Sequence, residues 1–315
     1  FNLNQPFELT EEYKEYEGTD EEQDYLNQMW RNHCINDTYE PGSTFKIITS
    51  AAALEEGVVS LEDRFHCPGY IIVEDRRIRC HKTTGHGAES FVEGIENSCN
   101  PVFINVGLRI GADRFYDYFD QFGLLTKTGI DLPGEANTSS LIYTEDTMKP
   151  VDLATNAFGQ NFNCTMIQMV SAFSSLVNGG TYYQPHLVTK VLDSNGGTVK
   201  TISPILLKQT ISSRISSDIR SYMALSVQQG TSRHSKVQGY SSGGKTGTAE
   251  KYPRGNGKYL VSFIGFAPVD DPAVVIYVVV DEPNVEDQAN STYPQYIAQG
   301  ILSELLPYLN VVPDE

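Results

Sequence analysis

The stretch YEPGSTFKIITSAAALEEG, residues 39–57, predicts a helix with an unusual beginning. Its second half consists of strong helix formers, and Gly57 favours a helix end, which gives a helix over 43–56. The Pro-Gly pair before it favours a turn and sets Ser43 at the helix N-terminus. Because residues three apart share one face of a helix, Lys46 can reach Ser43. We therefore expect a hydroxyl and an amine side by side at a helix N-terminus.

This pair has the elements of a nucleophile and its base. A serine hydroxyl is a weak nucleophile until a base removes its proton. A lysine amine can be that base when burial or a second cation lowers its pKa. A Ser-x-x-Lys pair arises by chance about once in a chain of this size, so it indicates catalysis only together with other motifs.

Composition limits the class of protein. The 315 residues, 40% of them hydrophobic and 20% charged, are enough for one large globular domain or two of ordinary size. The net charge of −17 argues against nucleic acid as a partner, because phosphate binding requires a basic patch. Much of the acid excess lies in residues 8–24, which we interpret as a solvated segment. The chain opens on Phe1, without an initiator Met, and has no long apolar run, so we expect it to be a processed or cropped piece.

Helical and strand patterns alternate along the rest of the chain. Further helices are predicted over 112–123, 165–178, 213–229 and 296–309, hairpins over 67–80 and 186–202, and strands over 242–250, 259–268 and 273–282. The last strand is apolar on both faces, so we expect it to lie inside a sheet that is covered on each side. The pattern indicates an α+β domain over 41–315, preceded by an acidic N-terminal segment, residues 1–40.

Two further motifs follow the Ser-x-x-Lys pair. ENSCNPVF contains Ser98-Cys99-Asn100 just before a helical segment, and SGGKTGTAE contains Lys245-Thr246-Gly247 at the start of a strand. Serine-x-x-lysine, Ser-x-Asn and Lys-Thr-Gly in this chain order are the signature of penicillin-binding proteins and class A β-lactamases. Each triplet is weak alone, but the ordered set is highly specific.

From about residue 39 onward the chain resembles the transpeptidase domain of class B penicillin-binding proteins, in their division and sporulation branch. The segments that carry the resemblance are YEPGSTFKI, GIDLPGEA, AFGQNFNCTMIQMVSAFSSLVNGG and SGGKTGTAEK. It implies the penicillin-binding/serine β-lactamase-like fold, an antiparallel sheet flanked by helices with an all-helical lobe. It also implies a D,D-transpeptidase that cross-links peptidoglycan stem peptides ending in D-Ala-D-Ala and is acylated by β-lactams. No cofactor is needed for that catalysis. A membrane glycosyltransferase is the implied partner, and the extracytoplasmic face of the bacterial membrane the implied location, with an N-terminal anchor.

The resemblance also implies a role for each motif residue. Ser43 attacks the carbonyl between the two D-alanines, and Lys46 takes its proton. Ser98 relays a proton to the leaving amine, and Asn100 holds the amide backbone of the substrate. Lys245 supplies positive charge that helps to keep Lys46 neutral.

The remaining motif residues are implied to bind the substrate. Thr246 and Thr248 hold its terminal carboxylate, and the backbone N–H groups of Ser43 and Thr248 form the oxyanion hole. Gly247 lacks a side chain that would block the approach of substrate along the strand.

The chain departs from the family pattern at two points. Cys99 stands where the signature of the second motif has Asp. The family's sheet also uses a strand pair upstream of the nucleophile helix, and residues 1–40 show no convincing pair.

Four residues suggest a second site. Cys67, Cys80, His86 and Cys99 follow the spacing C-x12-C-x5-H-x12-C, and three thiolates with one imidazole suit structural Zn²⁺. Two alternatives remain open, a Cys67–Cys80 disulfide across the hairpin and buried free thiols. Substitute ligands would be His66 and His81, and ordinary thiols are expected at Cys34 and Cys164.

Three other functions compete with transpeptidation. A D,D-carboxypeptidase passes the same acyl group to water, and a β-lactam-sensing receptor is acylated once and signals. A class A β-lactamase deacylates through a glutamate-positioned water. We find no Glu-x-x-Leu-Asn segment between the second and third motifs, which disfavours the lactamase.

Overall fold

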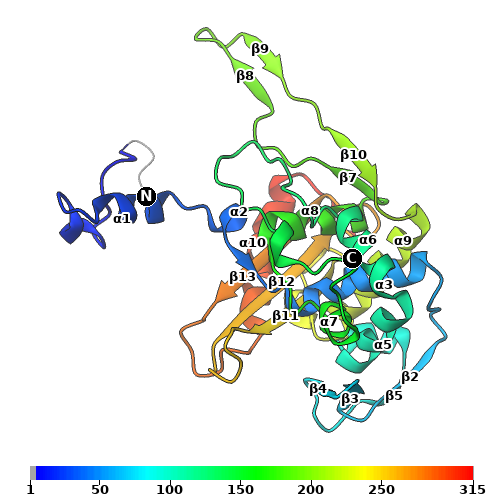
Figure 1. Cartoon of the computed structure of the whole chain (residues 1–315). Helices are drawn as coiled ribbons and strands as arrows, with labels where there is room; N and C mark the ends of the chain where they lie inside the picture. Colours follow the sequence, from blue (N-terminus) through cyan, green and yellow to red (C-terminus); the bar gives the residue numbers. More distant parts are fainter. Residues whose placement is uncertain (1–4, 315) are drawn as a thin grey trace.

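A three-stranded antiparallel sheet lies at the centre of the computed structural model, which describes residues 5–314 (Figure 1). The strands, in the spatial order β11–β12–β13, are β11 (Gly243–Glu250), β12 (Tyr259–Ala267) and β13 (Val274–Asp281). Aromatic and β-branched residues, which favour strands, fill much of β12 and β13. Every residue from Leu260 to Ala267 is buried, because β12 is paired on both edges and covered on both faces.

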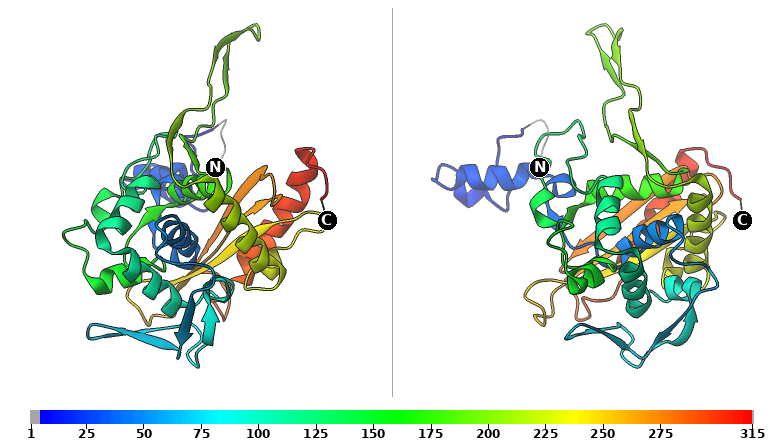
Figure 2. Two further views of the ribbon diagram at one scale, coloured as in Figure 1. Left: turned by 90° about the vertical axis from the view of Figure 1, so that its right-hand side faces the viewer. Right: turned by 45° about the vertical axis from the view of Figure 1, so that its right-hand side comes forward.

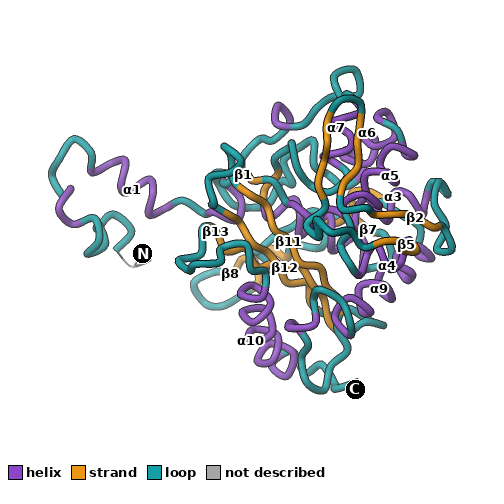
Figure 3. Tube along the Cα trace, turned by 90° about the horizontal axis from the view of Figure 1, so that it is seen from below, coloured by secondary structure: helices purple, strands orange, loops and turns teal. Residues whose placement is uncertain are grey.

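Helices cover the two faces of this sheet. Helix α10 (Thr292–Tyr308) buries Leu302 and Leu306 on one face, near Val274 and Ile276 of β13. Successive strand residues point to opposite faces, so the neighbouring Val275 and Tyr277 pack against the larger core on the other side. Figures 2 and 3 show α10 on one side of the sheet and the other large helices on the opposite side.

The larger core surrounds helix α3 (Lys46–Glu55). All residues of α3 from Lys46 to Ala53 are buried, and α3 packs against helices from three different parts of the chain, α5, α8 and α9. A helix without a solvated face belongs in the interior, and its position places the Lys46 amine inside the protein. The helices of this lobe are α4 (Phe91–Glu96), α5 (Asn100–Ile110), α6 (Ala112–Gln121), α7 (Pro150–Asn156), α8 (Met166–Val177) and α9 (Ser213–Gln228).

Short elements complete the described part of the chain. The two-stranded pairs are β1 (Thr38–Tyr39) with β6 (Cys164–Thr165), β2 (Arg64–Cys67) with β5 (Gly87–Ser90), β3 (Tyr70–Val73) with β4 (Arg76–Arg79), β7 (Thr181–Tyr183) with β10 (Leu206–Gln209), and β8 (Lys190–Leu192) with β9 (Thr198–Thr201). The other helices are α1 (Glu22–Trp30) and α2 (His33–Asn36), with 3-10 turns η1 (Lys14–Tyr16), η2 (Gly42–Phe45), η3 (Ser139–Leu141) and η4 (Arg233–Ser235). The β8–β9 hairpin and the segment that carries α1 extend away from the body (Figure 1). Within residues 5–314, none of the helices is both long and apolar enough to cross a membrane.

Most predicted elements are present at the expected places. The helix over 43–56 begins as the 3-10 turn η2 and continues as α3, and both predicted hairpins form. The C-terminal helix begins at Thr292, earlier than predicted, because Pro294 is tolerated in the first turn of a helix. The division between residues 1–40 and 41–315 stays a prediction.

One expectation about the sheet is wrong for the described residues. We expected β13 to lie inside the sheet, but no strand of residues 5–314 pairs with its outer edge, and most of its residues are half-buried. Its apolar character on both faces comes from the helices that cover each face, not from strands on both edges. Whether a strand lies at the edge of a sheet and whether its two faces are covered are separate properties. An apolar sequence pattern indicates only that the faces are covered.

The packing of α10 can be tested by truncating one buried side chain. Leu302 is 2% exposed, and we expect Leu302→Ala to lower the free energy of unfolding by about 2–4 kcal/mol through lost burial and a residual cavity. The measurement is urea unfolding followed by circular dichroism. The matched control is the adjacent Ile301→Ala, because Ile301 is 46% exposed and should change the free energy by less than about 1 kcal/mol. Equal losses in the two variants would contradict the assigned face of α10.

Candidate active site

The turn that carries Ser43 is pressed against strand β11. Gly42 has a φ of +60°, and its N–H donates a 2.8 Å hydrogen bond to the carbonyl oxygen of Gly159. A Cβ atom on Gly42 would lie 2.9 Å from the Thr248 carbonyl oxygen, so the close approach of the turn to β11 requires glycine. Ser43 is half-buried, whereas Gly42 and Thr44 on either side are buried. The turn therefore holds a partly accessible hydroxyl beside β11.

Lys46, one turn after Ser43, is fully buried, and its amine has three acceptors within hydrogen-bond distance, none of which is the Ser43 hydroxyl. Its Nζ donates to the Ser98 carbonyl oxygen at 2.7 Å, to Ser98 Oγ at 3.1 Å and to Asn100 Oδ1 at 2.7 Å. Burial lowers the pKa of Lys46 to about 8, against the opposing effect of nearby Cys80, Cys99 and Glu89. A lysine with such a pKa is partly neutral near physiological pH and can accept a proton.

A second buried amine, that of Lys245, also lies within hydrogen-bond distance of the Ser98 hydroxyl. Lys245, on β11, donates from Nζ to Ser98 Oγ at 2.9 Å and to the carbonyl oxygen of Thr246 at 3.0 Å. Burial first, and then the charge of Lys46, hold the pKa of Lys245 well below its usual range. Burial is the main cause of both low pKa values, and the repulsion between the two amines is mutual, so the expected role of Lys245 in keeping Lys46 neutral stays a prediction. Both amines lie within hydrogen-bond distance of the same oxygen, Ser98 Oγ, so a charge on one disfavours a charge on the other.

The turn between α4 and α5 brings the second motif to these amines. Ser98 has a φ of +52°, a conformation that L-residues seldom adopt and that occurs often at functional sites. Asn100 begins α5, followed by a proline that suits the first turn of a helix. Its amide is held at both ends, because Nδ2 donates to the Arg79 carbonyl oxygen at 3.1 Å while Oδ1 accepts from Lys46.

The third motif lies along the edge of β11 that no strand covers in residues 5–314. Gly247 pairs with Ser262 of β12, and a Cβ atom on Gly247 would lie 2.3 Å from Ser262 Oγ and 3.1 Å from a methyl of Thr44. Thr246 Oγ1 lies 3.4 Å from the hydroxyl of Thr231, and Thr248 Oγ1 lies 3.4 Å from the carbonyl oxygen of Ala289. Two hydroxyls thus point toward loops that flank the strand.

The structure therefore gathers the three motifs, which are far apart in the sequence, around one point. Direct hydrogen bonds join Lys46, Ser98, Asn100 and Lys245, and the Ser43 turn and Gly247 meet through the contact of η2 with β11. The catalytic and binding roles of these residues stay predictions.

The four predicted metal ligands also converge. The sulfur atoms of Cys67, Cys80 and Cys99 and a ring nitrogen of His86 all lie within 4.8 Å of one another. Tetrahedral zinc with Zn–S bonds of about 2.3 Å needs sulfurs about 3.8 Å apart, so small adjustments would complete such a site. The five cysteines are free thiols in this structure, and the Cys67–Cys80 disulfide is not formed. Of the substitute ligands, His81 lies 3.8 Å from Cys80 Sγ, whereas His66 is exposed and outside the group.

A buried carboxylate beside this group was missed by the sequence analysis. Glu89 is 2% exposed, and its Oε1 has no hydrogen-bond partner among the described residues, although it lies 3.9 Å from His86 Nδ1. An unpaired buried carboxylate oxygen is costly, and the nitrogen beside it, His86 Nδ1, is the same one that lies 3.7 Å from Cys80 Sγ. Glu89 stands three residues after His86, and no motif marks it.

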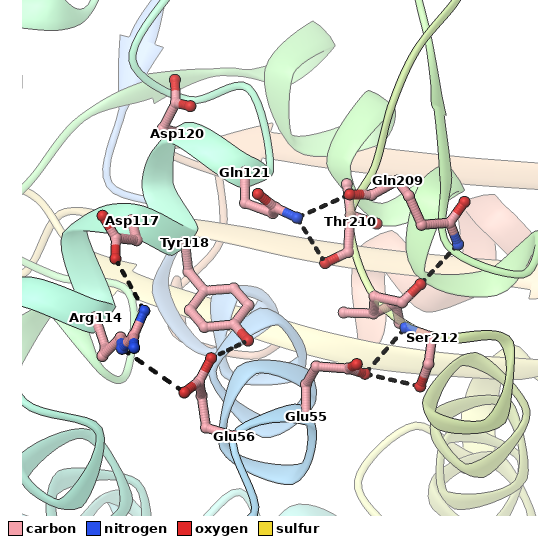
Figure 4. A pocket seen from close by; sticks show the side chains of 11 residues that line it. Glu55, Glu56, Arg114, Asp117, Tyr118, Asp120, Gln121, Gln209, Thr210 and Ser212 are labelled. Atoms are coloured by element: carbon pink, nitrogen blue, oxygen red, sulfur yellow. Dashed lines mark hydrogen bonds and ion pairs between the residues drawn. The ribbon is translucent and has the colours of Figure 1, made fainter.

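A separate cavity of about 600 Å³ lies at the other end of α3. Figure 4 shows its polar side chains paired with one another: Tyr118 donates to Glu56, and Glu55 accepts from the backbone N–H and the hydroxyl of Ser212 at the start of α9. None of the motif residues lines this cavity. We assign it no part in the candidate site.

Comparison with known proteins identifies the family. A protein-family model described as the penicillin binding protein transpeptidase domain matches residues 9–303. The chain is 46% identical over 290 residues to stage V sporulation protein D of Bacillus subtilis, covering 90% of this chain and 44% of that protein. It is 30% identical to penicillin-binding protein PbpB of Mycolicibacterium smegmatis over 80% of this chain and 40% of that protein. The chain thus spans less than half the length of these relatives.

Solved structures agree with the sequence relatives. Penicillin-binding protein 3 of Mycobacterium tuberculosis superposes with a TM-score of 0.81 at 26% identity, over 90% of this chain and 66% of that chain. The D,D-transpeptidase domain of a peptidoglycan glycosyltransferase from Eggerthella lenta gives a TM-score of 0.77 at 28% identity, over 88% and 68% of the two chains. The α+β fold predicted from the sequence is confirmed. The chain belongs to the penicillin-binding protein transpeptidase domain family.

Proposed function

We propose that this chain is the catalytic domain of a peptidoglycan D,D-transpeptidase that works through an acyl-enzyme on Ser43. The observation that carries the proposal is the buried pair of amines, Lys46 and Lys245, joined through the hydroxyl of Ser98, with Lys46 one turn after the half-buried Ser43. Two buried amines that share one hydroxyl provide both a proton acceptor and a proton path, which is what acyl transfer to and from a serine requires.

In the first step, Ser43 Oγ attacks the carbonyl carbon between the two D-alanines while Lys46 takes the hydroxyl proton. The new C–O bond forms and the C–N bond breaks. The leaving D-alanine amine receives a proton through Ser98, which lies 3.1 Å from the Lys46 amine. In the second step, the amine of another stem peptide attacks the ester, transfers its proton back along the same path and frees Ser43.

Substrate binding is assigned to β11 and to the turn before α5. The N–H groups of Ser43 and Thr248 would stabilise the oxyanion, and loss of one such donor typically slows a reaction about 10²- to 10³-fold. The hydroxyls of Thr246 and Thr248 would bind the terminal carboxylate. Asn100 would hold the amide of the substrate, with its own amide oriented by Lys46 and Arg79.

The names of the relatives support this function and its setting. Stage V sporulation protein D and the PenA, MrdA and FtsI-like D,D-transpeptidases are among them, which supports a role in cell division or in synthesis of the spore cortex. Structures of M. tuberculosis penicillin-binding protein 3 with aztreonam and with ampicillin support acylation by β-lactams. We propose that the domain acts on the outer face of the cell membrane, tethered by an anchor and paired with a membrane glycosyltransferase.

Acylation at Ser43 is the first test of this proposal. After incubation with a fluorescent penicillin, we expect a single adduct on the peptide that contains Ser43, and no adduct in Ser43→Ala, because that variant lacks the nucleophilic oxygen. Mass spectrometry of the digested protein locates the adduct, and Ser50→Ala serves as the control, since Ser50 lies about two helical turns after Ser43 and is buried. Labelling that persists in Ser43→Ala would refute the assignment.

Turnover separates the competing functions. A thioester analogue of D-Ala-D-Ala with an added D-amino acid should give the transfer product if the domain is a transpeptidase. Release of the free acid alone would instead indicate a D,D-carboxypeptidase. Stable acylation by penicillin without turnover of the thioester would favour the β-lactam-sensing receptor.

We also propose that Cys67, Cys80, His86 and Cys99 hold a structural zinc ion. Two observations support it: the four ligand atoms converge, and three of the four residues are buried. Cys99 stands between Ser98 and Asn100, so the metal would hold the turn that carries both residues. Zinc would supply rigidity here and no chemistry.

Metal analysis tests the zinc site. Protein purified without added reductant from zinc-replete medium should contain about one zinc per chain, and Cys80→Ser should lower this content several-fold because it removes one of four ligands. The control is Cys164→Ser, since Cys164 is also buried but lies outside the group. A parent protein that contains no zinc and in which Cys67 and Cys80 are oxidised would contradict the zinc site and support the disulfide.

A further inference from the structure

The phenol of Tyr277 lies behind the Ser43 turn, on the strand farthest from β11. Tyr277 belongs to β13 and points into the larger core. Its oxygen lies 2.7 Å from the hydroxyl of Tyr39 and 3.5 Å from Thr44 Oγ1. Thr44 is 1% exposed and directly follows Ser43. No motif contains Tyr277, and the proposed mechanism does not use it.

The direction of these hydrogen bonds follows from counting protons. Each hydroxyl has one proton, and Thr44 donates its proton to the carbonyl oxygen of Pro41 at 2.8 Å. The oxygen of Thr44 is therefore left to accept from Tyr277, whose own oxygen accepts from Tyr39. The hydrogen bonds thus run from Tyr39 to Tyr277, from Tyr277 to Thr44 and from Thr44 to Pro41. They begin and end in the segment just before the Ser43 turn.

The same phenol also adjoins the other wall of the site. Burial raises the pKa of Tyr277 to about 12, while the hydroxyls of Thr44, Tyr39 and Ser262 act in the opposite direction. Ser262 pairs with Gly247, and its Oγ occupies the space that a side chain at Gly247 would need. Tyr277 pairs with Ile264 of β12, so its phenol connects the Ser43 turn to the sheet that contains β11. With its pKa raised, the phenol keeps its proton at neutral pH and continues to donate.

We propose that Tyr277 is a positioning residue, whose hydroxyl sets the spacing between the Ser43 turn and β11 by holding Thr44 and, through it, the Pro41 carbonyl. This inference rests on the proposed function, in which the N–H groups of Ser43 and Thr248 form the oxyanion hole. One of those groups belongs to the turn and the other to β11, so a small shift of the turn changes the distance between them. The effect should appear in the chemical step, because no atom of Tyr277 is assigned to substrate binding.

The test compares acylation kinetics in the parent and in Tyr277→Phe, which keeps the ring and removes the hydroxyl. Stopped-flow reaction with a chromogenic cephalosporin gives the first-order acylation constant and the dissociation constant of the initial complex separately. We expect the first-order constant of Tyr277→Phe to fall about tenfold, with the dissociation constant changed by less than about twofold. In a Thr44→Val background, Tyr277→Phe should have less than about a twofold further effect, because the two residues act in one chain.

The control is Tyr118→Phe, which removes a phenol hydroxyl that is hydrogen-bonded to Glu56 away from the site (Figure 4). It should acylate within about twofold of the parent. The inference is overturned if Tyr277→Phe acylates at the parent rate, if its loss lies in the dissociation constant, or if Tyr118→Phe loses as much. A parent that is not acylated at all would overturn the proposed function and the inference with it, whereas a reactive parent with an unaffected Tyr277→Phe would overturn the inference alone.

Discussion

The site depends on the sharing of one buried hydroxyl, that of Ser98, between the amines of Lys46 and Lys245. Both amines lie in the interior, where an unpaired ammonium is costly, and each has acceptors within hydrogen-bond distance. Burial lowers both pKa values, so the arrangement keeps a basic amine at a pH where an exposed lysine would be fully charged. Every proposed chemical step requires this property.

The fold explains how two lysines come to be buried. Helix α3 has no solvated face along most of its length, so the Lys46 amine lies in the core. Strand β11 lies against the turn at the start of that helix, and the glycines at positions 42 and 247 allow the approach, because a Cβ atom at either place would collide with neighbouring atoms. The sheet, the central helix and the Ser98 turn thus meet at one point. If Tyr277 acts as we propose, β13 supports the same point from behind.

Much of this site could be predicted from the sequence, for a physical reason. Helix periodicity places Ser43 and Lys46 one turn apart, and the other motifs have short spacings that local structure determines. The sequence pattern did not reveal that Lys46 Nζ bonds to Ser98 and Asn100. The cysteine spacing likewise predicted a cluster that the structure brings together. Tyr277 escaped prediction because its contact is tertiary and joins it to Thr44 across more than 200 residues of chain, whereas Glu89 stands only three residues from His86 but belongs to no motif. The edge position of β13 was not predicted either, because apolar residues on both faces of a strand do not show whether another strand pairs with each of its edges.

The pH dependence of acylation tests the central claim most directly. If Lys46 takes the Ser43 proton as a neutral amine, the first-order acylation constant should rise about tenfold per pH unit below a pKa of about 8 and level off above it. The measurement is the acylation constant of the parent domain between pH 6 and pH 10, over a range in which circular dichroism shows it to be folded. A rate that does not change across this range, or that continues to rise to the ordinary lysine pKa of about 10.4, would contradict a buried and partly neutral Lys46 as the base.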